Sequence, residues 1–130
     1  MRNQLAVQMY TVRDFTKSPK DFVRTIQKIQ KIGYKAVQFS AIGCMGTDKP
    51  LLRVKEAKTI LDDHGIACVA THRDWAGYTN QIDQEIEFHQ QLGCTYTALG
   101  SWPSEPFGKK AGSFEHFAEL VGPIVNKFNS

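Results

Sequence analysis

Apolar and polar positions follow a repeating order along the chain. Three times, a stripe of apolar side chains at helical spacing ends at a glycine, and a short apolar run follows. The members of this repeat are Gly33 before residues 35–40, Gly65 before residues 67–72 and Gly93 before residues 95–100. Glycine suits the left-handed backbone conformation that ends many helices. The glycines lie 32 and 28 residues apart, close to the length of one strand–helix unit, which predicts a parallel α/β architecture.

Four helices are predicted from their start signals. Ser18 can cap the first helix, with Pro19 at its first position and Asp21 three residues after the cap. Its apolar stripe consists of Phe22, Val23, Ile26, Ile29 and Ile32. The other helices are predicted to begin at Asp48, near Asn80 and at Ser113. Pro123 lies inside the last pattern, where we expect it to kink or shorten the helix.

The order of strands and helices predicts a sector of a barrel. Strands near 4–10, 35–40, 67–72 and 95–100 each precede a helix. Right-handed connections between sequential parallel strands place every helix on the same face of the sheet. We therefore expect an α/β fold of four consecutive βα units, half of a TIM (β/α)8 barrel, with a single domain over residues 1–130. The alternative is an open doubly wound sheet, which usually carries a glycine-rich loop after its first strand, and residues 10–14 contain no glycine.

Composition agrees with one globular domain. The chain has 130 residues, of which 42% are hydrophobic, and a formal net charge of +3. No apolar run approaches the ~18 residues needed to span a membrane, and the N-terminus shows no signal-peptide pattern. Its three cysteines are widely spaced, which argues against a disulfide framework or a zinc ribbon. We expect a cytoplasmic protein with no membrane partner.

Basic residues recur along the first predicted helix. They are Lys17, Lys20, Arg24, Lys28, Lys31 and Lys35. Such a stripe invites a nucleic-acid hypothesis. We favour a solvated outer face of a barrel helix instead, since the stripe lies opposite the apolar one. Charge is also polarised, because residues 1–73 carry 13 basic and 6 acidic side chains whereas residues 74–108 carry 5 acidic and no basic ones.

Polar residues at the predicted strand ends are the candidates for a binding site. In a parallel barrel, ligands bind at the carboxyl ends of the strands. Gln38 and His72 end the second and third strands, and histidine can bind a metal or exchange a proton near neutral pH. Tyr10 and Trp102 lie at the ends of strands one and four, and Trp75 is expected in the loop after strand three. Aromatic rings there can stack on a sugar or cap the core. A rim that only meets solvent is the structural alternative.

Several motifs together resemble the sugar phosphate isomerase/epimerase family. The motifs are Gln8–Arg13, Gly33–Gln38, Leu61–Gly65, Cys68–His72, Leu92–Tyr96 and the turn Gly100–Pro103. This family belongs to the xylose isomerase-like TIM barrel group, which also includes the AP endonuclease family 2 enzymes. The resemblance covers nearly the whole chain and implies the N-terminal half of such a barrel.

The resemblance also implies chemistry at the mouth of the full-length barrel. A divalent metal, Mn, Mg, Zn or Co, would act there on a sugar or polyol. By position, His72 matches a histidine that contacts substrate or, in the endonuclease branch, a metal, and it is the single metal-ligand candidate. Gln38 matches a position that is often glutamate, where an amide can bind a hydroxyl but cannot act as a base. Tyr10 matches the rim of strand one. The family takes most metal ligands from strands five to eight, so we assign no catalytic residue and expect this chain alone to hold no metal tightly and to be inactive.

Three functional hypotheses follow. The first is a sugar phosphate isomerase/epimerase that acts on a small sugar or polyol and is completed by a C-terminal half. The second is a non-catalytic half-barrel that self-associates into a barrel-like dimer, because bare parallel edges invite pairing. The third is AP-endonuclease-like DNA repair, which requires several metal-binding residues, of which only His72 is in place.

Overall fold

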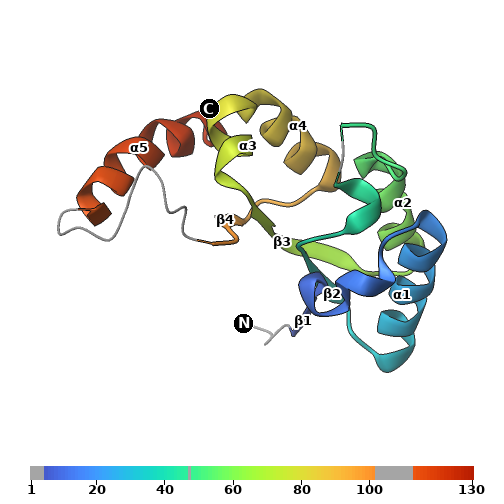
Figure 1. Ribbon diagram of the computed structural model, residues 1–130. Helices are drawn as coiled ribbons and strands as arrows, with labels where there is room; N and C mark the ends of the chain where they lie inside the picture. Colours follow the sequence, from blue (N-terminus) through green and yellow to red (C-terminus); the bar gives the residue numbers. More distant parts are fainter. Residues whose placement is uncertain (1–4, 47, 102–112) are drawn as a thin grey trace.

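Four parallel strands form one sheet in the order β1-β2-β3-β4. The computed structural model describes residues 5–46, 48–101 and 113–130. The strands are β1 (Ala6–Gln8), β2 (Ala36–Phe39), β3 (Ala67–Arg73) and β4 (Thr97–Leu99). Neighbours in the sheet are also neighbours in the sequence, as in a sector of a barrel (Figure 1).

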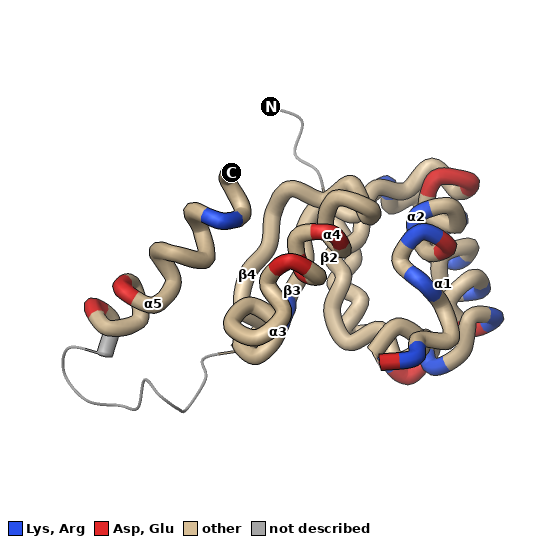
Figure 2. Tube along the Cα trace, turned by 90° about the horizontal axis from the view of Figure 1, so that it is seen from above, with Lys and Arg blue, Asp and Glu red and all other residues tan. Residues whose placement is uncertain are grey.

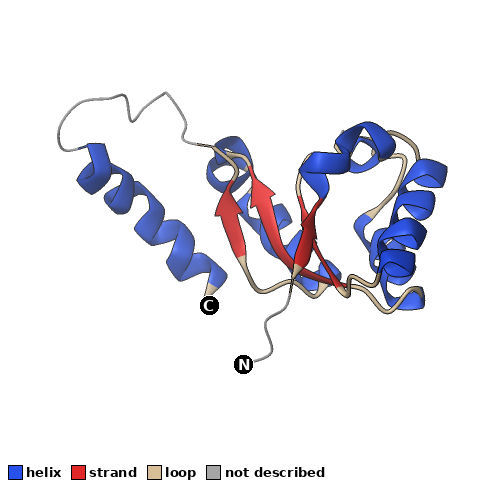
Figure 3. Cartoon of the chain, turned by 90° about the horizontal axis from the view of Figure 1, so that it is seen from below, coloured by secondary structure: helices blue, strands red, loops and turns tan. Residues whose placement is uncertain are grey.

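Helices follow each of these strands. They are α1 (Pro19–Ile32), α2 (Val54–Asp63), α3 (Trp75–Asn80), α4 (Ile82–Leu92) and α5 (Ser113–Phe128), with two short 3-10 helices, η1 (Met9–Phe15) and η2 (Gly43–Met45). α2 packs against both α1 and α4. α5 lies on the β4 side of the sheet, far from α1, as the cartoon in Figure 3 also shows. In the part of the chain that the structure describes, no helix combines the length and apolar character that crossing a membrane requires.

The predicted ends of α1 are confirmed. The Ser18 hydroxyl accepts a hydrogen bond from the Asp21 amide at 3.1 Å. At the other end, Gly33 has a φ of 108°, in the left-handed region that favours glycine. α5 also begins where the sequence predicts, and it continues through Pro123 to Phe128, so the proline does not shorten it.

The predicted start of α2 is wrong. The helix begins at Val54 rather than at Asp48. The Glu56 carboxylate accepts a hydrogen bond from the Arg53 amide at 2.8 Å, which satisfies one of the free donors at a helix start. This contact caps the helix at Arg53, five residues after the predicted cap at Asp48.

Two further segments differ from their predictions. β1 ends at Gln8, and the next seven residues turn into η1, so Tyr10 stands on a 3-10 helix rather than on a strand. The segment predicted as a loop after strand three forms α3, because the Asp74 carboxylate caps it by accepting the Gly77 amide at 2.7 Å.

The core lies between the sheet and the helices α1, α2 and α4. Phe22 of α1 is fully buried and meets Phe39 of β2 edge to face, with ring centroids 6.0 Å apart. Ile26 and Leu61 are fully buried beside them. The basic side chains of α1 lie on its outer face (Figure 2), where Lys20, Arg24, Lys28 and Lys31 are exposed. This arrangement is what we expect of a solvated barrel helix.

Candidate functional site

The two faces of the sheet are distinguished by side-chain contacts at the strand ends. Thr71 and Arg73 of β3 contact α4, because Thr71 Oγ1 lies 2.7 Å from His89 Nε2 and Arg73 binds Glu85. Successive side chains of a strand point to opposite faces. His72 therefore points to the face away from the helices, the face that would line the interior of a barrel.

The same argument places Gln38 on this inner face. Phe39 packs on Phe22 of α1, so its neighbour Gln38 points the other way. The strand register pairs Gln38 with Gln8 on one side and with Ala70 on the other, and it pairs His72 with Ala98. The sequence predicts Gln38 and His72 as site residues. They lie on the same face of neighbouring strands, since His72 follows the partner of Gln38, Ala70, by two residues.

The inner face carries small or polar side chains near its carboxyl end. Gln38 and His72 are half-buried, whereas Gln8 and Ala98 are exposed. A Cβ placed on Gly100 would lie 3.3 Å from the Cβ of His72, so glycine leaves room beside the imidazole. Amides and a histidine in such a row can donate and accept hydrogen bonds, as binding of a hydroxylated ligand requires.

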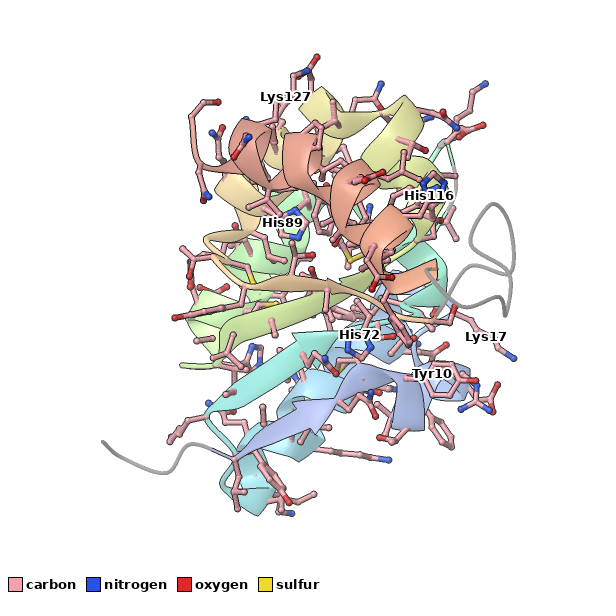
Figure 4. The ribbon with its side chains drawn as sticks, turned by 90° about the vertical axis from the view of Figure 1, so that its left-hand side faces the viewer. Tyr10, Lys17, His72, His89, His116 and Lys127 are labelled. Atoms are coloured by element: carbon pink, nitrogen blue, oxygen red, sulfur yellow. The ribbon has the colours of Figure 1, made fainter. Side chains whose placement is uncertain are left out.

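The remaining two predicted site residues do not join this row. Tyr10 lies at the same end of the molecule as His72 (Figure 4), but its ring is 48% exposed and stacks under the Arg13 guanidinium at 4.3 Å. A rotation of this side chain would be needed before it could cover the inner face. Trp102 lies outside the described residues.

Metal ligands do not converge at this face. Within residues 5–46, 48–101 and 113–130, no group of three or more His, Cys, Asp or Glu side chains stands close enough to hold a metal ion. His72 supplies one donor, whereas catalytic zinc sites use about three protein ligands. The described residues alone therefore do not fit the divalent metal that the family resemblance implies, and no chemical step is assigned to it.

An ion pair behind the site holds β3 to α4. Arg73 Nε donates to Glu85 Oε2 at 2.7 Å, and its terminal nitrogen donates to Oε1 at 2.6 Å. The guanidinium also lies 4.3 Å from the centre of the Phe88 ring. The Glu85 side chain is 8% exposed and that of Arg73 is 32% exposed. This two-pronged contact fixes the strand residue that follows His72, and the sequence pattern gave no signal for it beyond an acidic residue in the first turn of α4.

A chain of hydroxyl groups ends at the buried His89. The Tyr78 hydroxyl contacts Thr97 Oγ1, which lies 2.7 Å from Thr71 Oγ1, and Thr71 contacts His89 Nε2. His89 Nδ1 lies 2.6 Å from the Glu85 carbonyl oxygen. Since a carbonyl only accepts, Nδ1 carries the proton and Nε2 accepts from Thr71. Burial lowers the pKa of His89, so the neutral ring is the form that this network holds.

Stability should fall in mild acid because of His89. The ring binds a proton readily in the unfolded chain, near its ordinary pKa of 6.5, but only at lower pH when folded. The contribution of neutral His89 to the free energy of unfolding is therefore fully present above pH 6.5. As the pH falls from 6.5 toward the lowered pKa of the folded state, the free energy of unfolding decreases by about 1.4 kcal/mol per pH unit. Urea unfolding between pH 7.5 and 5 measures this slope. His89→Gln should flatten it.

Comparisons with known proteins bear on the fold. No family model matches the chain, and no curated protein matches it. A sugar phosphate isomerase/epimerase from Parabacteroides distasonis has a similar structure, with a TM-score of 0.62 and 19% sequence identity. The chain has half of that fold. The alignment covers 96% of this chain and 48% of that one, so the chain spans about half the length of the protein it matches.

The predicted fold class is therefore confirmed. Four sequential parallel strands with intervening helices form half of a TIM barrel, and the structural likeness covers nearly the whole chain. At 19% identity the likeness establishes the fold of this half-barrel. The roles of Gln38, His72, Tyr10 and Trp102 remain predictions.

Proposed function

We propose that this half-barrel is the sugar-binding part of a sugar phosphate isomerase/epimerase. The observation that carries the proposal is the row of Gln8, Gln38 and His72 on the inner face of the sheet, at the carboxyl ends of its strands. The structural likeness to an enzyme of that description supports the class of ligand. In parallel barrels this is the end at which substrates bind.

The chemistry of the row suits a sugar or polyol. Each glutamine amide offers two donors and an acceptor carbonyl, which matches the alternating needs of neighbouring hydroxyl groups. His72 can hold a hydroxyl through either ring nitrogen, as donor or as acceptor. The Gln38 amide acts neither as an acid nor as a base, so its proposed role is to orient the ligand. Any proton transfer on this half would pass through His72.

Ligand titration by NMR tests this proposal. Adding a pentose, a hexose phosphate or an inositol to the labelled full chain should shift the resonances of Gln38 and His72 first. Gln38→Ala and His72→Ala should each weaken binding about tenfold, the loss of about 1.4 kcal/mol that removal of a ligand hydrogen bond brings. His116→Ala on α5 is the matched control and should bind as wild type. Shifts that spare the inner face, or equal binding by all variants, would contradict the proposal.

Self-association is a second candidate function, which the distribution of exposed apolar side chains supports. Leu5, just before β1, is 74% exposed, Ile32 at the end of α1 is 72% exposed, and Tyr96, just before β4, is 72% exposed. Phe15 after β1 and Phe114 at the start of α5 are 64% and 77% exposed at the other end. Exposed apolar side chains therefore stand in the chain before and after each of the two edge strands.

A dimer of two copies can pair both open edges of each sheet, β1 and β4, at the same time. If β1 of each copy pairs in parallel with β4 of the other, Leu5 and Ile32 meet Tyr96, and Phe15 meets Phe114. In this arrangement Lys20 and Arg24 of α1 face the start of α5, where Glu115 and Glu119 lie. A C2 dimer of this kind closes eight strands and places a second Gln38 and His72 at its mouth. Light scattering should give twice the 14.7 kDa mass of the chain.

A further inference from the structure

Two of the three cysteines lie close to each other, one in β3 and one in the segment that leads into β4. Cys68 lies in β3, and Cys94 lies three residues before β4. The strands pair Thr71 with Thr97, and the Thr71 amide donates to the Tyr96 carbonyl at 3.1 Å. Cys68 and Cys94 each stand three residues before this pair in the chain, where β3 and the segment before β4 run side by side. Neighbouring strands lie about 4.8 Å apart, which is within the Cα separation that a disulfide spans.

Both thiols are buried, and each also contacts the backbone of its own strand. Cys68 and Cys94 are 7% and 5% exposed and belong to the same hydrophobic core. The Cys68 thiol donates to the Ala70 carbonyl at 3.4 Å, and the Cys94 thiol donates to the Tyr96 carbonyl at 3.3 Å. The two side chains also lie within hydrogen-bonding reach of each other. They are free cysteines in this structure.

The two thiols differ in acidity because they share one hydrogen bond. The Cys68 thiol stabilises a thiolate at Cys94, which lowers the pKa of Cys94 to about 7 although burial opposes this. The same contact, followed by burial, raises the pKa of Cys68. Lys58 of α2 lies over Gly93, the neighbour of Cys94, but it is paired with Asp62. His89 of α4, whose carbonyl accepts the Cys94 amide, is held neutral by burial.

A cavity gives a small reagent a route toward Cys94, which is itself 5% exposed. This residue lines an open cavity of about 980 Å³ between β4, α4 and α5, together with Tyr96, Ile86 and Val125. β4 has only three residues and pairs with β3 on one side only. Short edge strands open more readily than central ones, which gives further access to the pair.

We propose that Cys68 and Cys94 are a modification site, a dithiol that a hydroperoxide converts into an intramolecular disulfide. The Cys94 thiolate attacks one peroxide oxygen and the O–O bond breaks, leaving a sulfenic acid on Cys94 and, after protonation, water or an alcohol. The Cys68 sulfur then attacks the Cys94 sulfur, its proton leaves with the hydroxyl as water, and the S–S bond forms. Two thiols are oxidised by two electrons, and one peroxide is reduced.

Cys44 provides the matched control within the same chain. It is 1% exposed in η2 and has no second cysteine beside it among the described residues. Burial raises the pKa of its thiol. Cys44 should therefore stay reduced under conditions that oxidise the pair.

Mass spectrometry of the full chain tests the proposal. Treatment of the reduced protein with hydrogen peroxide should lower its mass by two hydrogen atoms, and peptide mapping should join the Cys68 and Cys94 peptides. At pH 7, iodoacetamide should modify Cys94 at least about tenfold faster than Cys44, because only the thiolate reacts. Cys68→Ser should instead accumulate a sulfenic acid on Cys94, which dimedone traps, and Cys44→Ser should form the disulfide as wild type.

Three results would overturn this assignment. One is oxidation of Cys94 to a sulfenic or sulfinic acid in the wild-type chain without a link to Cys68. Another is a disulfide that contains Cys44. The third is equal alkylation of Cys44 and Cys94 at pH 7. The mapping and alkylation of the wild-type chain do not depend on the folding of any variant.

Discussion

Replacing Arg73 with methionine should lower the free energy of unfolding by about 3 kcal/mol, near the lower end of what the loss of one partner from a buried ion pair costs. Methionine keeps the apolar stem over Phe88 but removes both donors to Glu85. The Glu85 carboxylate, 8% exposed, is then left without its counter-charge. Because Arg73 is 32% exposed, water reaches its position, and we expect less than the largest losses known for such pairs.

Urea unfolding at pH 7 measures the effect of this change. The double variant Arg73→Met with Glu85→Leu should recover most of the loss, since no unpaired charge remains. Arg53→Met is the matched control, because Arg53 also binds a glutamate, Glu56, but at the surface with side chains 77% and 47% exposed. That change should have little effect on stability, because water screens this exposed pair. Equal losses at Arg73 and Arg53 would show that the β3–α4 ion pair does not contribute as argued.

Replacing Tyr96 with glutamate should dissociate the proposed dimer. Tyr96 stands at the open edge of β4, and in the dimer its ring would be covered by Leu5 and Ile32 of the second copy. A carboxylate there would be buried against the apolar side chains of Leu5 and Ile32, so we expect the dissociation constant to rise at least about tenfold, or about 1.4 kcal/mol. Leu5→Glu should have the same effect from the other edge. Sedimentation velocity over a concentration series measures both.

The control for these edge variants lies away from both edges. Leu51, in the segment between β2 and α2, is 69% exposed, close to the exposure of Leu5 and Tyr96. Leu51→Glu should leave the dissociation constant unchanged. A wild-type chain that sediments as a monomer at micromolar concentration, or edge variants that associate like Leu51→Glu, would contradict self-association through β1 and β4.

The sequence predicted the four strands and their order, together with the helices α1, α2, α4 and α5, because those depend on local signals. The Ser18–Pro19 start of α1 and the glycine at Gly33 act through the backbone within one turn of the helix, and both stand where they were predicted. The apolar runs also placed all four strands, although β1 and β4 proved to be three residues long. Alternation along β2 and β3 then put Gln38 and His72 on the same face.

Local signals failed where a competing contact lay a few residues away. The Asp48–Pro50 pair is a valid start signal, but the contact between Arg53 and Glu56 takes its place. In the same way, the cap by Asp74 turns a predicted loop into α3 and moves Trp75 onto a helix. The competing capping residues can all be read from the sequence. Only the folded path of the chain shows which of them caps a helix.

Contacts between distant positions were decided by the tertiary structure alone. Thr71 meets His89 and Thr97, and Arg73 meets Glu85, only because β4 and α4 return to the side of β3. Cys68 and Cys94 looked like widely spaced single thiols in the sequence, yet the strand register makes them neighbours. The sequence by itself determined the strand–helix repeat and the polar ends of the strands, since hydrophobic periodicity and caps act over a few residues. The structure decided which polar groups pair, because pairing depends on strand register and helix packing.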